Sequence, residues 1–191
     1  MRARASSCER ALEGTGFVIA PQRVMTNAHV VAGTDEVSVE VGDQQLRGQV
    51  VLYDPDTDVA VLAVPALRAA PLALAEGEAT SGQDGIVLGY PLDGPYTAAA
   101  ARVRDRIELN GPDIYDSHQV SRDVFTLRAV VRSGNSGGPL VDTSGAVVGV
   151  IFGAAVDNSE TGFALTAREV ADEVAAAPGL SQQVGTGRCA S

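Results

Sequence analysis

Short runs of valine, alanine and leucine, interrupted by glycine, proline and aspartate, recur along the whole sequence. Such runs are too short for most helices, and their frequent turn residues predict a mainly β, turn-rich fold. In the first half, the pattern predicts strands that form an antiparallel sheet closed on itself. These strands are expected at Glu13–Ala20, Val24–Thr26, Val37–Val41, Leu46–Tyr53 and Val59–Val64.

A second series of strands follows a connection rich in Ala, Pro, Glu and Gly at about residues 66–83. The stretch Asn110–Arg122 contains turn residues and several acids and is predicted to be an exposed loop. Helical spacing over Ala167–Ala177, ending before Pro178, predicts a C-terminal helix. The expected strands are Ile86–Gly89, Ala98–Leu109, Val124–Val131, Pro139–Val141, Ala146–Phe152 and Gly162–Leu165.

Length and charge narrow the possible functions. The 191 residues suffice for one sizeable domain or two small units in tight contact. A formal net charge of -10, with scattered basic residues, argues against nucleic acid as a partner and weakly favours neutral or basic polypeptides. Residues 1–10 lack the apolar centre of a signal peptide and precede an apparent domain start near Ala11. We therefore expect Met1 to begin an excised domain, with any membrane anchor upstream.

The two cysteines, Cys8 and Cys189, lie near opposite ends of the chain. A disulfide between them would close a long loop and stabilise the fold by about 4 to 5 kcal/mol, less any native strain. Two unrelated free thiols are the alternative. A disulfide would place the protein in an oxidising compartment.

Three local motifs carry candidate chemistry: Thr26 to Val31 around His29, Asp58 to Leu62, and Gly134 to Leu140 around Ser136. A serine hydroxyl becomes nucleophilic when an imidazole removes its proton, and a carboxylate orients that imidazole. The order His29, Asp58, Ser136 suits this chemistry. Glycines let the backbone turn so that the N–H groups of Gly134 and Ser136 can form an oxyanion hole.

Each of these motifs also has an interpretation without catalysis. His29 on its own could be a core histidine, and the Gly-rich stretch a tight turn with a solvated Ser136. His118, in a polar segment, is the weaker candidate base. Alternating Asp54, Asp56 and Asp58 suggest a calcium loop, but Val59 and Pro65 stand where such a loop needs Gly and Glu, so no metal site is predicted.

The three motifs and their order resemble the trypsin-like serine proteases, specifically the bacterial HtrA-type branch, from about Gly14 to Leu165. The resemblance implies an all-β fold of two six-stranded antiparallel β-barrels with a C-terminal helix. Within a single domain, 1–191, the barrels would span 11–74 and 84–166, with the helix at 167–177. It also implies a serine endopeptidase that needs no metal or organic cofactor.

Three further segments, Leu12–Ile19, Gly111–Tyr115 and Phe152–Ala155, resemble the periplasmic domain of the actinobacterial MarP family of acid-resistance proteases. That resemblance implies an upstream transmembrane region, an extracytoplasmic location, a Cys8–Cys189 disulfide and a role in acid or envelope stress. The chain departs from the family pattern at Asn135, where Asp is expected, and only about 25 residues follow Leu165, too few for a PDZ domain.

In this fold the residue six before the nucleophile lies at the base of the primary specificity pocket, which places Val130 there, with Phe152, Gly153 and Phe163 as walls. Without an acid at the base, we expect a medium apolar residue at the cleavage site. We expect the chain to be monomeric. The alternatives are a catalytically silent polypeptide-binding module of the same fold and a structural subunit of a membrane complex.

Overall fold

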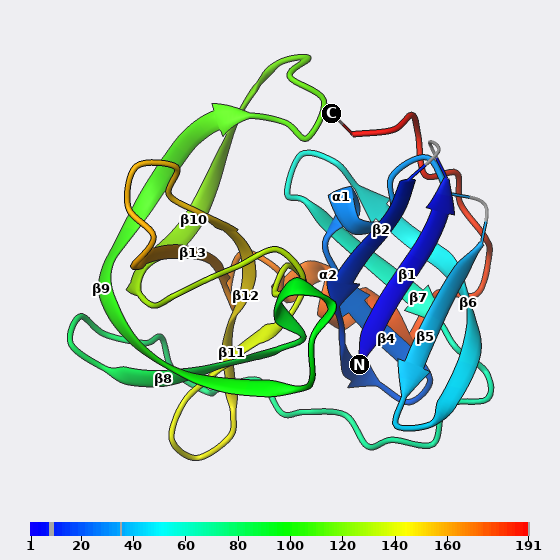
Figure 1. Cartoon of the computed structure of the whole chain (residues 1–191), viewed down its shortest axis with the longest axis horizontal. Coiled ribbons are helices and arrows are strands. Elements are labelled where there is room, and N and C mark those ends of the chain that lie inside the picture. The colour runs from blue at the N-terminus through cyan, green and yellow to red at the C-terminus, as the bar shows by residue number, and fades with distance from the viewer. Residues whose placement is uncertain (8–9, 35, 191) are drawn as a thin grey trace.

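A computed structural model describes residues 1–7, 10–34 and 36–190 of the chain. Two antiparallel β structures lie side by side in Figure 1, and the chain completes the first before it enters the second. The first is a seven-stranded sheet in the order β2-β1-β5-β6-β7-β4-β3. Its strands are β1 (Arg2–Ser7), β2 (Arg10–Thr15), β3 (Phe17–Ala20), β4 (Arg23–Thr26), β5 (Val37–Val41), β6 (Gln44–Asp54) and β7 (Val59–Ala63).

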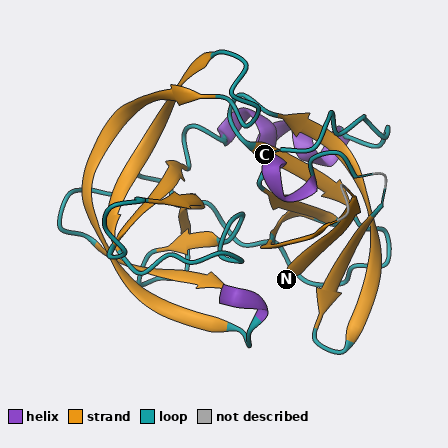
Figure 2. Cartoon of the chain, turned by 45° about the horizontal axis from the view of Figure 1, so that its top comes forward, coloured by secondary structure: helices purple, strands orange, loops and turns teal. Residues whose placement is uncertain are grey.

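The second structure is a closed six-stranded barrel in the order β10-β13-β12-β11-β8-β9. Figure 2 shows that strands dominate and that the helices are short. The predicted all-β class, with two antiparallel β structures and a C-terminal helix, is confirmed. The barrel strands are β8 (Asp84–Gly89), β9 (Thr97–Pro112), β10 (Gln119–Arg128), β11 (Pro139–Val141), β12 (Val147–Ala154) and β13 (Thr161–Thr166). The helices are α1 (Ala28–Val31), η1 (Pro91–Asp93), α2 (Ala171–Ala176) and η2 (Ala177–Gly179).

The number of strands predicted for the first structure was wrong. It has seven, because residues 2–7 form the additional strand β1, which pairs with β2 and β5, and the single strand predicted at Glu13–Ala20 is divided into β2 and β3. It is also a sheet whose order runs from β2 to β3, and not the closed barrel that was predicted. The sequence of β1, RARASS, contains no large apolar residue, so its pattern gives no strand signal. Backbone pairing between two neighbours nevertheless holds it in the sheet.

The predicted exposed loop at Asn110–Arg122 was also wrong in extent. β9 and β10 continue as a hairpin until Pro112 pairs with Gln119, and only residues 113–118 form the loop. The end of the hairpin is largely exposed, so its ladder needs no apolar alternation. The C-terminal helix α2 is shorter than predicted, because residues 167–170 form a turn in which Thr166 accepts a hydrogen bond from the Glu169 N–H.

A shared core joins the two structures. All five residues of β7 are buried, and one apolar cluster includes Met25 and Val61 from the first sheet with Val150 and Leu165 from the barrel. The C-terminal tail then returns to the first sheet, where the Val184 N–H bonds the carbonyl of Val50 at 3.0 Å (Figure 1, red). The junction between the first sheet and the barrel is therefore held by a shared apolar core and by the C-terminal tail. No helix in the described residues is long and apolar enough to cross a membrane.

Candidate active site

His29 and Asp58 form a close pair at this junction. His29 lies on α1, the single helical turn after β4, and Asp58 directly precedes β7. The His29 Nδ1 atom is 2.7 Å from Asp58 Oδ2, and the backbone N–H of His29 donates to Oδ1 at 2.9 Å. One carboxylate thus fixes both the ring and the backbone of the histidine. The Asp58 side chain is 5% exposed and that of His29 32%, so the ring is accessible.

Asp58 adopts a backbone conformation that few residues tolerate. Its φ angle is +64°, in the left-handed region, which Asp and Asn occupy more readily than other non-glycine residues. The side-chain amide of Asn27 donates to the carbonyl of Asp58 at 2.8 Å. The conformation is therefore held by contacts from the segment that carries His29.

The charge of Asp58 controls the basicity of His29. Burial disfavours the imidazolium, but the charge of Asp58 and the hydrogen bond to it outweigh this effect, so the pKa of His29 is raised. An imidazole whose cation is stabilised by a carboxylate is suited to accepting a proton. The pair can accept a proton from a hydroxyl group and stabilise the resulting cation.

Ser136 lies on a glycine turn that precedes β11. Gly134 and Gly137 have φ angles of +92° and +79°, which favour glycine. The Thr15 N–H donates to the carbonyl of Ser136 at 2.8 Å, and the Thr15 hydroxyl donates to the carbonyl of Gly134 at 2.6 Å. A residue of the first sheet therefore holds the turn on both sides of Asn135.

The same turn packs against the segment that leads to His29. A Cβ atom on Gly137 would lie 2.3 Å from the Thr15 carbonyl oxygen and the Thr26 hydroxyl, and 2.9 Å from the Asn27 nitrogen. No side chain fits there. The backbone of the Ser136 turn thus lies directly against residues that immediately precede α1.

Two backbone N–H groups of the turn remain available. Within the described part of the chain, neither the N–H of Gly134 nor that of Ser136 donates a hydrogen bond. Buried or half-buried N–H groups usually find acceptors, so two neighbouring ones without an acceptor are suited to an anionic oxygen.

Comparison with known proteins agrees with this geometry. A family model described as the trypsin-like peptidase domain matches residues 14–150. The chain belongs to the trypsin-like peptidase family. It is 56% identical over 192 residues to the serine protease Rv3671c of Mycobacterium tuberculosis, covering all of this chain and 48% of that protein. It is 34% identical over 151 residues to a probable periplasmic serine endoprotease DegP-like of Halomonas elongata, covering 78% of this chain and 31% of the relative. The chain therefore spans about half or less of the length of these relatives.

Solved structures of the same family also match. The active form of the Rv3671c protease from M. tuberculosis aligns with a TM-score of 0.96 at 55% identity, over 100% of this chain and 85% of that one. The inactive form of the same protease aligns with a TM-score of 0.83 at 55% identity, over 92% and 87% of the two chains. The backbone described here is thus more similar to the structure called active.

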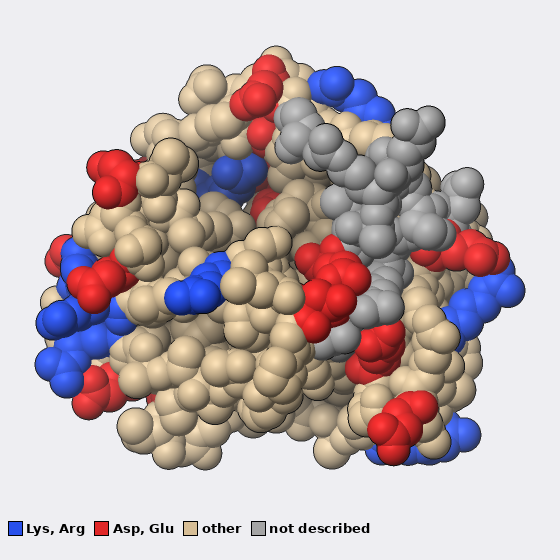
Figure 3. All heavy atoms as spheres, viewed as in Figure 1, with Lys and Arg blue, Asp and Glu red and all other residues tan. Residues whose placement is uncertain are grey.

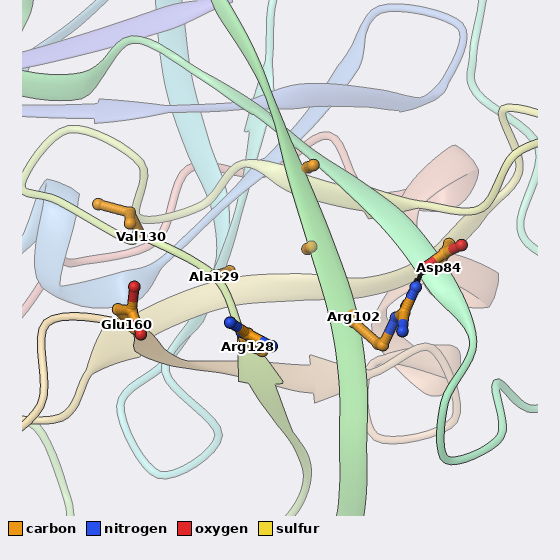
Figure 4. A pocket seen from close by; sticks show the side chains of 8 residues that line it. Asp84, Arg102, Arg128, Ala129, Val130 and Glu160 are labelled. Atoms are coloured by element: carbon orange, nitrogen blue, oxygen red, sulfur yellow. Dashed lines mark hydrogen bonds and ion pairs between the residues drawn. The ribbon is translucent and has the colours of Figure 1, made fainter.

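The predicted specificity residues of this trypsin-like chain lie on β12, on β13 and just after β10. Val130 is 45% exposed and borders a hollow of about 390 Å³ that also contains Arg128 and Glu160 (Figure 4). It borders a second hollow of about 300 Å³ with Arg132 and Asn135. The rings of Phe152 and Phe163, on adjacent strands, lie 6.3 Å apart. Whether Val130 forms the base and Phe152, Gly153 and Phe163 the walls of one pocket stays a prediction.

Sequence reasoning missed residues that position the site. Thr15 is buried and bonds the Ser136 turn, yet its sequence context offers one signal only, the flanking glycines. A Cβ on Gly14 would lie 2.6 Å from Val30, and one on Gly16 would lie 2.8 Å from Val24. Such glycines indicate close approach of other segments.

The remaining predicted residues have other roles. His118, predicted to be exposed in a loop, has Nε2 3.1 Å from Asp56 and Nδ1 3.5 Å from Asp113. One ligand atom each from Asp56, Asp113 and His118 lie within 4.8 Å of one another, so these three side chains could hold a metal ion, and the predicted absence of a metal site stays a prediction. Asp54 accepts hydrogen bonds from the Asp56 N–H and the Thr57 hydroxyl within its own turn. Cys8 lies outside the described residues, and its pairing with Cys189 stays a prediction.

Proposed function

We propose that this chain is the catalytic part of a serine endopeptidase in which Ser136 is the nucleophile, His29 the general base and Asp58 its orienting partner. The observation that supports this most directly is the double contact of Asp58 with His29, at a junction where the Ser136 turn packs against the same segment. In the first step, Ser136 Oγ attacks the peptide carbonyl carbon while His29 Nε2 takes the hydroxyl proton.

His29 then gives this proton to the leaving amine, and the carbon–nitrogen bond breaks to leave an acyl-enzyme. Water attacks the ester, loses a proton to His29 and releases the acid product, while the proton returns to Ser136. In both steps the N–H groups of Gly134 and Ser136 hold the negative carbonyl oxygen. Removing one such donor typically costs about 10²–10³-fold in kcat.

An open strand edge supports a polypeptide substrate. Ile151 exchanges hydrogen bonds with Gly137 and Gly138, but beyond it β12 pairs only with β13 among the described residues. The backbone of residues 152–154 can therefore add an extended peptide beside Ser136, as in other β-augmentation sites. We propose a medium apolar residue at the cleavage site, because Val130 offers no charge to pair with Arg or Lys.

The surface does not favour a polyanionic partner. On the face drawn in Figure 3, basic side chains lie mainly near the edges and beside acidic ones. Arg102 pairs with Asp84, and Arg106 with Asp123 at 2.6 Å. Since nucleic acid binding needs a continuous basic surface, we propose polypeptide as the partner of this site.

We further propose that the protease acts outside the cytoplasm, as part of a membrane-anchored protein that resists acid or envelope stress. The names of the DegP-like relatives, which call them periplasmic, support the compartment. A Cys8–Cys189 disulfide, which we propose, would be stable there. Cleavage measured before and after thiol reduction tests this part, and unchanged cleavage and thermal stability would contradict the disulfide.

The activity is tested by cleavage of a peptide library and by labelling with a fluorophosphonate. We expect both to succeed with the wild-type chain and to disappear in Ser136→Ala. Ser133→Ala, which removes an exposed hydroxyl on the same turn, is the matched control and should leave both unchanged. Failure of the folded wild-type chain to cleave or label would favour the catalytically silent polypeptide-binding module.

A further inference from the structure

A buried arginine of the barrel contacts the turn that carries Asp58. Arg122, on β10, is 6% exposed. Its Nε donates to the carbonyl of Asp56 at 2.6 Å, and its Nη1 donates to the carbonyl of Pro112 at 3.1 Å. Burying a guanidinium is costly unless its donors are satisfied. Two donors of Arg122 bind backbone carbonyls. One of these carbonyls, that of Asp56, belongs to a turn of the first sheet and not to the barrel.

Two hydrogen bonds fix the peptide unit between Asp56 and Thr57, one at its carbonyl and one at its N–H. Arg122 holds the carbonyl of Asp56, and the N–H of Thr57, in the same planar unit, donates to Asp54 Oδ1 at 3.2 Å. Asp58 is the next residue. The orientation of this peptide unit therefore determines the direction in which the chain enters Asp58.

Two more contacts join the same hairpin to the turn. His118 Nε2 lies 3.1 Å from Asp56 Oδ1, and the Ile114 N–H donates to the carbonyl of Pro55 at 3.4 Å. The hairpin loop is itself shaped by Asp113, whose carboxylate accepts the N–H groups of Tyr115 and Ser117 at 3.2 and 2.7 Å. The barrel thus offers a preformed surface to the turn.

Asp58 needs such support because its φ angle of +64° is strained for a residue with a side chain. A rotation of the preceding peptide unit would move the carboxylate away from His29. The pair depends on two short contacts, at 2.7 and 2.9 Å, which tolerate little displacement.

We infer that Arg122 is a positioning residue: through the carbonyl of Asp56 it holds the Asp58 turn in the orientation that pairs with His29. The inference rests on the proposed serine protease function. It makes the barrel, which supplies Ser136, also responsible for the geometry of the His29–Asp58 pair in the first sheet.

The test replaces Arg122 with Met, which fills similar space but cannot donate, and measures kcat, KM and the pKa of His29. We expect kcat to fall about tenfold, because a small misplacement of a catalytic group slows the chemical step. KM should stay within about twofold, since the substrate edge on β12 is untouched. With Asp58 displaced, the contacts that raise the pKa of His29 weaken, so that pKa should fall. The chain has two histidines, which makes an NMR titration of both imidazoles practical.

Arg106→Met is the matched control. Arg106 lies on β9 of the same hairpin and pairs with Asp123 on its surface, away from the Asp58 turn. It should change neither kcat nor the pKa of His29. Arg122→Lys, which keeps a cation that can reach one carbonyl but not both, should give intermediate values of kcat and of the His29 pKa.

A folded Arg122→Met protein with wild-type kcat and an unchanged His29 pKa would overturn the inference. If this variant fails to fold, Arg122→Lys decides in its place, and wild-type values in the folded lysine variant would overturn the inference equally. Failure of the proposed function is distinguishable, because it would leave the wild-type chain without cleavage, while the NMR titration still reports whether Arg122 controls the His29–Asp58 pair.

Discussion

The hydroxyl of Thr15 donates a 2.6 Å hydrogen bond to the carbonyl oxygen of Gly134, across the junction between the first sheet and the barrel. The same hydroxyl accepts the N–H of Tyr90 at 3.1 Å, and the Thr15 carbonyl accepts the Thr26 hydroxyl at 2.8 Å. Thr15 therefore links the turn that carries Ser136 to the strand that leads to His29. Its location decides the relative placement of two candidate catalytic residues.

Replacing Thr15 with Val removes this hydroxyl with little change in shape. The Gly134 carbonyl and the Tyr90 N–H lose that partner in a buried place, so the free energy of unfolding should fall by about 1–3 kcal/mol. Because the turn also loosens, kcat should fall. Thr126→Val, which removes an exposed hydroxyl, is the control for urea denaturation and kinetics. Equal effects of the two substitutions would contradict the linking role.

The space around Gly137 makes it intolerant of a side chain. Gly137→Ala would place a Cβ 2.3 Å from the Thr15 carbonyl at a positive φ, so the turn must shift. Gly145 also has a positive φ, +89°, but nothing lies within 4 Å of its Cβ position. We expect Gly145→Ala to cost about 1 kcal/mol of stability and Gly137→Ala distinctly more, together with loss of activity. Denaturation curves that coincide for the two variants would argue against the tight junction.

Asp58→Asn should remove the orienting charge without disturbing the backbone, since asparagine tolerates the left-handed region. We expect kcat to fall about 10³–10⁴-fold and the melting temperature to change little. The pKa of His29 should drop, because the charge that raises it is lost while the burial that lowers it remains. Retention of even a tenth of the activity would exclude the assigned role of Asp58.

The activity should depend on pH through His29. The imidazole must be neutral to accept the Ser136 proton, so kcat/KM should rise with pH through an apparent pKa above the ordinary histidine value of 6.5. The effect on stability has the opposite sign. Because the pKa of His29 is higher in the folded state, His29 contributes its full stabilisation at pH values below its unfolded-state pKa. This contribution is lost as the pH rises through its folded-state pKa. An acidic limb below 6.5 in the kcat/KM profile would contradict this.

Val130→Asp tests the assignment of the specificity pocket. An acid at the pocket base would pair with a cationic side chain, so cleavage should shift from apolar residues towards Arg and Lys in a peptide library. Val156→Asp, at a fully exposed position, is the control and should leave the preference unchanged. An unaltered preference in the folded Val130→Asp protein would place the pocket elsewhere.

Buried strands and unusual backbone angles can be predicted from the local sequence, because each requires particular residue types at its own positions. The strand Val59–Ala63 is buried throughout, so all its residues are apolar and its run of valines and leucine could be recognised. The glycines around Ser136 were likewise recognisable, because positive φ angles and close approach demand glycine at those positions. These features determined the all-β class and drew attention to His29, Asp58 and Ser136.

Polar contacts between distant segments cannot be predicted from the local sequence. β1 is held by backbone pairing, and the β9–β10 hairpin extends through an exposed polar stretch, so neither required an apolar pattern. Thr15 bonds a carbonyl 119 residues away, and Arg122 bonds one 66 residues away. A threonine or arginine in any strand could make such a bond, and only the tertiary structure decides which carbonyl it meets.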